Sequence, residues 1–481
     1  MAMTGAAFML AACVSMAPSY EVPVLPVASS YAESAAQALS QTASIGWREY
    51  FTDPDLQALI AAALDNNRDL RIAVLRVEEA RATYGIQRSA QFPNINAQAG
   101  MDRSRTPADL NITRKPLLVS QYQVALGLAS WEIDFWGRIS SLKEAALENY
   151  LASDEARRAV SIALIAQVAN GYLGLREMDE RIALANQTTV SREDSLRIFT
   201  RRVEVGSSSR LELTQVQTLL TQAQGLRAQL QMTRATQVNA LTLLVGTPID
   251  MPAMQNQSNS PEILIELTPG LPSELLINRP DIVAAEHQLK ASHANIGAAR
   301  AAFFPRIALT GSLGTASAEL SGLFASGSLA WSFSPSISLP IFDGGRNRNN
   351  LDLAEVRRDL AVANYEKTVQ SAFRDVSDAL AARHWLSEQV GIAQAALRAQ
   401  TERARLSQLR YDNGASTFLE ILDAQRELLV AEQQLVQTRR TLLSSRVSLY
   451  AALGGGLNAA SSHSASDTPK SLEPARAKNT P

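Results

Sequence analysis

Four segments of the chain alternate apolar residues with small or polar ones at a period of two. Such alternation places successive side chains on opposite faces of a β-strand. It predicts strands at about 94–104, 119–131, 306–315 and 328–341. One apolar face and one small polar face over about 10 residues is typical of membrane β-barrel strands. A soluble β-sandwich also alternates, but four strands set among so much predicted helix make a poor sandwich.

Two long segments between these strands favour helix. No proline occurs from Arg138 to Val203 or from Arg346 to Asp412. A helix of roughly 65 residues would be on the order of 100 Å long. A helix of that length needs a packed seam, and the first segment supplies an apolar stripe at Ile162, Ile165, Val168, Ala169 and Tyr172. A plain soluble coiled coil is the alternative, but it does not explain the strands.

The chain is an internal tandem repeat. Four landmarks recur in the same order, separated by 208 to 212 residues, and they lie at Asn67/Asn278, Pro93/Pro305, Gly137/Gly345 and Gly206/Gly414. Each copy comprises a helix, two strands, a very long helix, a turn and a second long helix. We therefore expect a first repeat at 47–250, a linker at 251–271, a second repeat at 272–456 and a disordered tail at 457–481.

Four strands are too few to close a membrane barrel. An open sheet edge cannot face lipid, because its backbone N–H and C=O groups would remain unpaired. Strands from several chains must therefore join, and three copies would supply twelve strands, a plausible closed size. The predicted fold class is mainly α with a membrane β-barrel, formed by a homotrimer with six-fold pseudo-symmetry.

The N-terminus has the pattern of a bacterial lipoprotein signal. Residues 1–12 are largely apolar and end in Leu10-Ala11-Ala12, directly before Cys13. Small residues after an apolar stretch are typical of a cleavage site, and this tetrad resembles a lipobox that acylates the cysteine. We expect lipid on Cys13 and a tether at 13–46. The usual basic residues are missing from 1–8, and an ordinary core cysteine is the alternative reading of Cys13.

Composition narrows the function further. The formal net charge is -2, so nothing points to nucleic acid. Four His and one Cys argue against metal clusters and disulfide frameworks. No apolar run reaches the ~18–20 residues of a membrane-spanning helix. No nucleophile–base or paired-acid spacing indicates an enzyme, and we expect no cofactor other than the lipid on Cys13.

Long and distinctive motifs lie at 47–54, 297–305, 339–346, 422–426 and 450–456. In these motifs the chain resembles a family, the outer-membrane efflux factors or TolC-like proteins, and especially their lipidated OprM/NodT-type branch. The resemblance implies a β-barrel continued by an α-helical barrel that reaches through the periplasm and closes at its inner tip. It implies a conduit for small molecules such as drugs, docked on a periplasmic membrane-fusion adaptor and an RND-type inner-membrane pump.

The turns between the paired long helices are candidate docking tips. Glycine suits the left-handed position that ends a helix. In each turn a Ser or Thr then precedes a Glu by three residues, which predicts a capping box. A well-made hairpin is one reading, and adaptor docking, suggested mainly by the resemblance, is the other. The tip residues are Gly206, Ser207, Ser208, Ser209, Gly414, Ala415, Ser416 and Thr417.

A candidate periplasmic gate follows the second tip. Leu419, Asp423 and Arg426 share one helix face, and in a trimer each would form a ring of three. A carboxylate ring would need arginine partners or a bound cation. The same face in the first repeat has Gln215 and Thr218, so only the second hairpin is expected to carry the charged gate. An ordinary exposed Asp–Arg pair is the alternative.

The sequence is also compatible with two other functions. One is an outlet for polypeptide secretion, and the other is a structural coiled-coil lipoprotein without a pore. A defined channel conductance would separate the pore-forming readings from the structural one.

Overall fold

The computed structural model describes residues 16–23, 27, 45–252, 263–265 and 279–455. The predicted signal segment 1–12, Cys13 and the tail 457–481 lie outside the described residues, as do most of the predicted tether and linker. The chain forms two compact units. Unit 1 comprises Met1–Leu25, Leu75–Asp154 and Ala284–Lys367, and unit 2 comprises Pro26–Val74, Glu155–Val283 and Thr368–Pro481.

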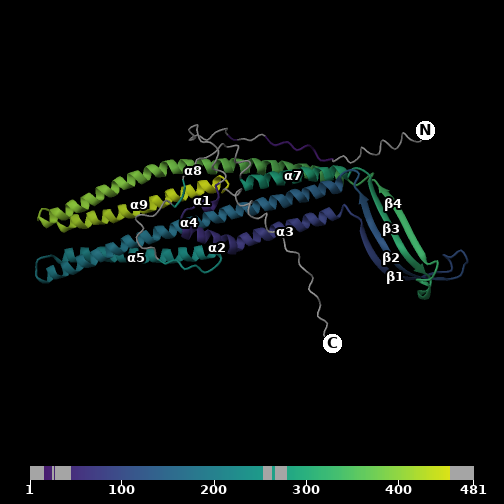
Figure 1. The fold of residues 1–481 in the computed structure, drawn as a ribbon, viewed down its shortest axis with the longest axis horizontal. Coiled ribbons are helices and arrows are strands. Elements are labelled where there is room, and N and C mark those ends of the chain that lie inside the picture. The colour runs from purple at the N-terminus through teal and green to yellow at the C-terminus, as the bar shows by residue number, and fades with distance from the viewer. Residues whose placement is uncertain (1–15, 24–26, 28–44, 253–262, 266–278, 456–481) are drawn as a thin grey trace, which may run out of the picture. The chain divides into compact units, whose positions relative to one another are not determined.

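Unit 1 contains one antiparallel sheet with the order β1-β2-β3-β4 (Figure 1). The strands are β1 (Asn94–Thr106), β2 (Leu117–Ile133), β3 (Arg306–Ser317) and β4 (Leu329–Ser338). The sequence expected β4 to continue to 341, but the strand ends before Pro340, whose nitrogen cannot donate to a ladder. Pro335 also lies inside β4, opposite Leu309 of β3, where its nitrogen cannot donate a hydrogen bond to a neighbouring strand.

The register separates an apolar face of the sheet from a polar one. Ile337 pairs with Ile307 and Trp331 with Leu313, so these apolar side chains share a face. On the other face the hydroxyls of Ser312 and Ser332 lie 2.8 Å apart. In the single chain the apolar face is open, and the side chain of Trp331 is 71% exposed. The sheet therefore presents an uncovered apolar surface.

Each transition from sheet to helix is built by an aspartate and by glycines with positive φ. Asp134 accepts hydrogen bonds from the backbone N–H groups of Ile139 (3.0 Å) and Ser140 (2.7 Å) at the start of α4 (Arg138–Glu204). In the second repeat, Asp343 accepts from the N–H groups at 345 and 347 at the start of α8 (Arg346–Asp412). The glycines adopt left-handed conformations that other residues avoid, and they are Gly137, Gly344 and Gly345.

Part of the predicted tether lies against helix α7 (Pro280–Ala301) in unit 1. The Tyr20 hydroxyl donates to Glu286 (3.2 Å), and its ring meets the edge of His293 at 5.6 Å between centroids. The ammonium of Lys290 lies 5.3 Å from the centroid of the Tyr20 ring. The stretch around Tyr20 is therefore fixed by specific contacts along α7.

Unit 2 has an aromatic core near the start of the first repeat. Helix α1 (Trp47–Tyr50) ends at Tyr50, whose ring stacks on Tyr450 at 4.4 Å between centroids. Phe51 is fully buried and pairs with Leu264, so three described residues of the predicted linker form a bridge to the repeat. Asp53 caps α2 (Pro54–Asn66) through the backbone N–H groups of its first turn.

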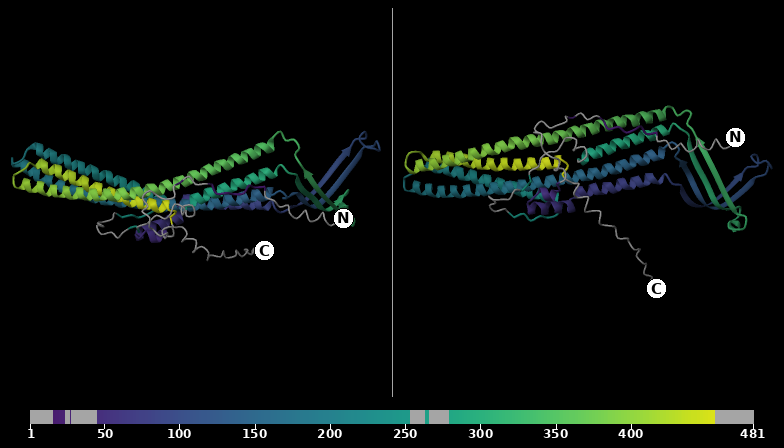
Figure 2. Two further views of the ribbon diagram at one scale, coloured as in Figure 1. Left: turned by 90° about the horizontal axis from the view of Figure 1, so that it is seen from above. Right: turned by 45° about the horizontal axis from the view of Figure 1, so that its top comes forward.

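The remaining helices form the hairpins. After α3 (Arg68–Ser89) and the first strand pair, α4 is followed by α5 (Arg210–Val245), and α8 is followed by α9 (Phe418–Ala452). Helices α4 and α8 each contain 67 residues. The views in Figure 2 show the two helices of each hairpin running side by side.

One helix of the described residues is long and apolar enough to cross a membrane. An 18-residue window in α4 has a mean hydropathy of 1.2, although the sequence analysis expected no such run. Because 61% of this window is buried, it behaves as a helix packed on protein neighbours.

Candidate functional site

The first hairpin tip is closed by two complementary motifs. Gly206 has φ +76°, its N–H donates to the carbonyl of Val203, and the N–H of Ser207 donates to the carbonyl of Arg202. These two bonds form a Schellman motif at the end of α4. Ser209 and Glu212 then form the predicted capping box at the start of α5, with each side chain accepting from the other's backbone N–H at 3.2 and 2.9 Å.

The electrostatics of the first tip favour an ionised Glu212. Its carboxylate accepts hydrogen bonds from the Ser208 hydroxyl (2.6 Å) and from the backbone N–H of Ser209. These bonds lower the pKa of Glu212 below its usual value. The rest of the tip is exposed, with the small residues Gly206 and Ser207 beside the larger Val205 and Leu211.

The second tip uses the same turn but a different cap. Gly414 has φ +71°, and the Schellman bonds run from its N–H to Tyr411 and from the N–H of Ala415 to Arg410. The predicted capping box at Thr417 is wrong, because the Thr417 side chain makes no capping hydrogen bond. The Glu420 carboxylate instead accepts from the guanidinium of Arg410 at 2.8 Å, so an ion pair across the turn replaces the local cap.

An aromatic cluster joins the two tips. The rings of Phe199 on α4 and Phe418 on α9 lie 4.1 Å apart between centroids, and both are buried. Tyr411 on α8 packs against Phe418, and its hydroxyl accepts a hydrogen bond from Arg202. The Arg202 guanidinium also lies 5.3 Å from the centroid of the Phe199 ring. The hairpins of the two repeats are therefore packed together at their ends.

The predicted gate residues lie just beyond this cluster, on the exposed face of α9. Leu419 is 56% exposed. The Asp423 carboxylate accepts from Arg426 at 2.5 Å, as the helical spacing suggested. It also accepts from Arg403 on α8 at 2.7 Å. Arg403 was not predicted from the sequence, because a pair between the two helices of a hairpin, 20 residues apart, leaves no local pattern.

Each Asp423 thus lies between two guanidiniums of its own hairpin. Arg426 also contacts the carboxylate of Glu427 at 3.3 Å. Exposed pairs of this kind contribute little to folding stability. They do fix the position of charge on a surface, and three copies around an axis would place these charges in rings.

Two hydrogen-bonded pairs of polar side chains link α4 to α9. The Arg192 guanidinium is almost fully buried and donates to the side-chain oxygen of Gln425. Desolvation lowers the pKa of Arg192. Two turns further along α9, Arg181 donates to Gln433 at 2.5 Å, and the Gln433 amide returns a bond to the Arg181 carbonyl. Helix α9, which carries the candidate gate residues, is therefore hydrogen-bonded to the first hairpin.

The first hairpin has no matching charged face. Thr218, the counterpart of Arg426, donates its hydroxyl to the carbonyl of Thr214 in its own helix at 2.9 Å. Gln215 stands where the second repeat has Asp423, and Ser195 stands where it has Arg403. The two repeats therefore share the turn but differ in the side chains beyond it.

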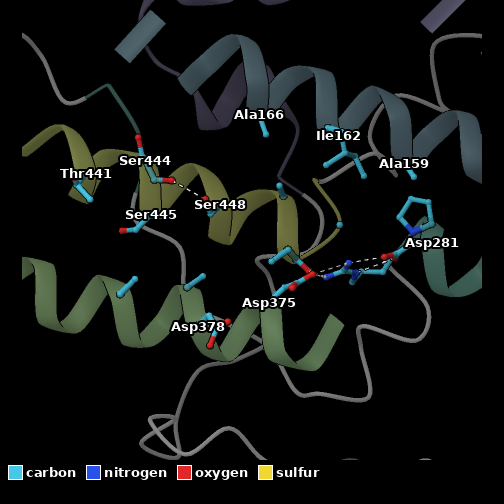
Figure 3. Close-up of a pocket in the computed structure, with 18 of the residues that line it drawn as sticks. Ala159, Ile162, Ala166, Asp281, Asp375, Asp378, Thr441, Ser444, Ser445 and Ser448 are labelled. Atoms are coloured by element: carbon cyan, nitrogen blue, oxygen red, sulfur yellow. Dashed lines mark hydrogen bonds and ion pairs between the residues drawn. The ribbon is translucent and has the colours of Figure 1, made fainter. Parts of the chain in front are cut away.

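A cavity of about 670 Å³ lies at the other end of α9, in unit 2 (Figure 3). Arg279 is held there between Asp281 (2.6 Å) and Asp375 (3.4 Å), and Ser448 donates to the Ser444 carbonyl. Much of the remaining lining is alanine. Because both carboxylates are engaged by the guanidinium, the cluster stabilises the start of α7 against α8.

Comparisons with known proteins agree with this architecture. The model of the family described as outer membrane efflux protein matches residues 59–247 and 271–455. The chain is 46% identical over 452 residues to the outer membrane protein OprJ of Pseudomonas aeruginosa, covering 94% of each chain. It is 45% identical to the solvent efflux pump outer membrane protein SrpC of Pseudomonas putida, covering 94% of this chain and 97% of SrpC.

A solved structure shares the fold. The open state of the MtrE outer membrane channel of Neisseria gonorrhoeae superposes with a TM-score of 0.84 at 41% identity, covering 92% of this chain and 99% of MtrE. The expected architecture of a mainly helical, tandem-repeat subunit with four strands is confirmed. The match of the family model to both repeats and the similarity to these relatives show that the chain belongs to the outer membrane efflux protein family.

Proposed function

We propose that three copies of this outer membrane efflux protein form a channel that exports small molecules such as drugs or solvents. The observation that carries the proposal is the sheet. Four strands end in two unpaired edges, β1 and β4, and one face is apolar and open. Neither an open edge nor isolated strands can face lipid, and pairing the β4 of one copy with the β1 of the next removes every edge. Three copies give a twelve-stranded closed barrel.

The helical hairpins supply the inner part of the conduit. Their tips expose small residues at closed turns, which suit docking by a periplasmic membrane-fusion adaptor. An RND-type inner-membrane pump, docked through that adaptor, would provide the energy for export. The names of the relatives, which refer to solvent and toluene efflux pumps, support small-molecule cargo.

The gate is assigned to the second hairpin. In a trimer with the exposed face of α9 inward, Leu419 would form an apolar ring, and Asp423 with its two arginines a charged one. Each carboxylate is already neutralised by guanidiniums, so three of them can approach one another without strong repulsion. The proposal includes a lipid on Cys13 that anchors the chain to the outer membrane.

Two measurements test this function. Purified full-length protein should have the mass of a trimer in detergent-corrected light scattering. It should also form channels of defined conductance in planar bilayers. A deletion strain should become sensitive to solvents and drugs, regain resistance with the wild-type gene, and yield an adaptor on co-purification. Trimers without conductance would favour a structural lipoprotein, and loss of a secreted polypeptide with unchanged drug resistance would favour a secretion outlet.

The lipid anchor has its own test. Intact-mass analysis of the mature protein should show an N-terminal Cys13 carrying acyl chains, and Cys13→Ala should remove that mass. An unmodified cysteine in the membrane-extracted protein would contradict the anchor.

A further inference from the structure

The outer end of strand β1 carries two arginines on the apolar face of the sheet. Along β1 the residues on this face are Ile95, Ala97, Ala99 and Met101, followed by Arg103 and Arg105. Across the ladder on β2, Arg103 pairs with Ser120 and Arg105 with Leu118. The side chains therefore change from apolar to cationic within one step of the alternation.

The position along β1 at which the side chains change from apolar to cationic matches the edge of the apolar part of a membrane. A strand rises about 3.4 Å per residue, so the eight steps from Ile95 to Arg103 cover about 27 Å. With a strand tilt of about 40°, this corresponds to about 20 Å along the membrane normal, and Arg105 lies about 26 Å from Ile95. The apolar band of such barrels is about 25 Å tall. Both guanidiniums therefore lie where the apolar band gives way to headgroups.

These arginines have no other evident role. Both are exposed, and neither makes a side-chain hydrogen bond or ion pair with the residues that the structure describes. The loop that follows adds Arg114 and Lys115, and the side chain of Asn111 supports it by donating to the Lys115 carbonyl at 2.7 Å. Asp102 alternates with Arg103 and so lies on the opposite, polar face. Four cations thus lie at the outer end of this hairpin, together with one exposed acidic residue of the loop, Asp109.

The corresponding hairpin of the second repeat has no such charges. Between Leu313 and Leu329 the only ionisable residue is Glu319, and the exposed apolar side chains are Leu320 and Phe324. General solubility would not need a cationic cluster in one repeat alone. The difference favours a specific anionic partner, with one site per chain.

We propose that Arg103 and Arg105, with Arg114 and Lys115, bind the phosphate groups of the phosphorylated glycolipid in the outer leaflet. The hairpin lies at the end of the sheet opposite the helices, and in an outer membrane channel with periplasmic helices this end meets the outer leaflet. Guanidinium pairs phosphate oxygens in a bidentate geometry. Each cation near an anionic membrane surface strengthens association about fivefold.

The test is glycolipid retention by the full-length channel. Native mass spectrometry would count lipopolysaccharide molecules per assembly after extraction, and binding would be titrated with purified lipopolysaccharide in nanodiscs. Arg103→Gln combined with Arg105→Gln should weaken binding about tenfold or more. The matched control, Arg76→Gln with Arg398→Gln, removes the same charge from exposed helical positions and should bind as wild type. Arg103→Lys with Arg105→Lys keeps the charge but loses the bidentate guanidinium, so this variant should bind more weakly than wild type and more tightly than the Gln pair.

Several outcomes would overturn the proposal. Equal losses in the control pair would mean that only net charge matters. Unchanged glycolipid retention by the Gln pair, with the assembly intact by light scattering, would show that these arginines do not form the binding site. Equal binding of phosphatidylglycerol nanodiscs or inorganic phosphate would exclude glycolipid as the ligand. Single-channel conductance should be unchanged in the Gln pair, so a failure here is distinguishable from a failure of the channel function.

Discussion

The two helical hairpins are closed by the same turn and differ in almost everything that surrounds it. Gly206 and Gly414 both end their helices in Schellman motifs with positive φ. After the first turn, Ser209 and Glu212 cap the next helix locally. After the second, the helix start has no side-chain cap, and Arg410 pairs with Glu420 instead. The duplicated feature is the backbone geometry, and the divergent feature is the side-chain charge.

This difference separates a structural role from a proposed gating role. A capping box depends on atoms within four residues, so it holds a tip in one conformation. Ion pairs such as Asp423 with Arg403 join two helices, and exposed pairs are weak enough to exchange partners. The first hairpin is therefore expected to act as the fixed element, and the second as the one that can move.

The largest expected effect tests whether the two tips are coupled. Phe418→Ala removes a buried ring that packs against Phe199 of the other hairpin, and a substitution of this type costs about 3–5 kcal/mol. Hydrogen exchange should show the loss of protection in both tips. A control at the exposed Leu419 on the same helix, Leu419→Ala, should leave exchange of the first tip unchanged. If Phe418→Ala affects only the second tip, the cluster does not couple the repeats.

A smaller effect separates the two caps. Ser209→Ala removes a side-chain cap and should destabilise the first tip by about 1 kcal/mol. Thr417→Ala removes no capping bond and should change stability by less than about 0.5 kcal/mol. Amide exchange at the start of α5 and α9 measures both. An equal loss of stability in the two variants would contradict the conclusion that only the first tip has a side-chain cap.

The smallest effect concerns pH. Hydrogen bonds from Ser208 and Ser209 lower the folded-state pKa of Glu212, so ionisation of Glu212 stabilises the first tip above its unfolded pKa of about 4.3. That stabilisation is lost as the pH falls through the lower, folded-state value. Exchange protection of the first tip should therefore decrease at acidic pH, and Glu212→Gln should abolish this dependence. A dependence that persists in Glu212→Gln would assign it to another group.

The local features of this molecule were accessible from its sequence. Strand alternation depends on neighbouring residues, and the left-handed glycines of both tips are dictated by the backbone alone, so these elements lie close to their predicted ranges. The β4 boundary was missed by three residues, since Pro340 could be read either as part of the alternation or as its end. The capping box at Thr417 failed because Arg410, ten residues away from Glu420, competes for the same carboxylate.

The contacts that shape the candidate gate were not accessible in this way. Arg403 and Asp423 are joined across a turn, and Arg192 and Gln425 are 233 residues apart in the sequence. Nothing in the local pattern distinguishes these side chains from other polar residues on long helices. The sequence located the hairpin that differs, and the structure identified its partners.

The most direct test of the proposed gate is single-channel conductance in planar bilayers. Asp423→Ala removes the carboxylate that Arg403 and Arg426 share and leaves Arg426 only its contact with Glu427. In a ring of three, the excess positive charge would cause repulsion, so conductance should rise severalfold. Gln215→Ala, the matched change in the first hairpin, should leave conductance at the wild-type level. Unchanged, low conductance in both Asp423→Ala and Arg426→Ala would contradict the assignment of the gate to the second hairpin.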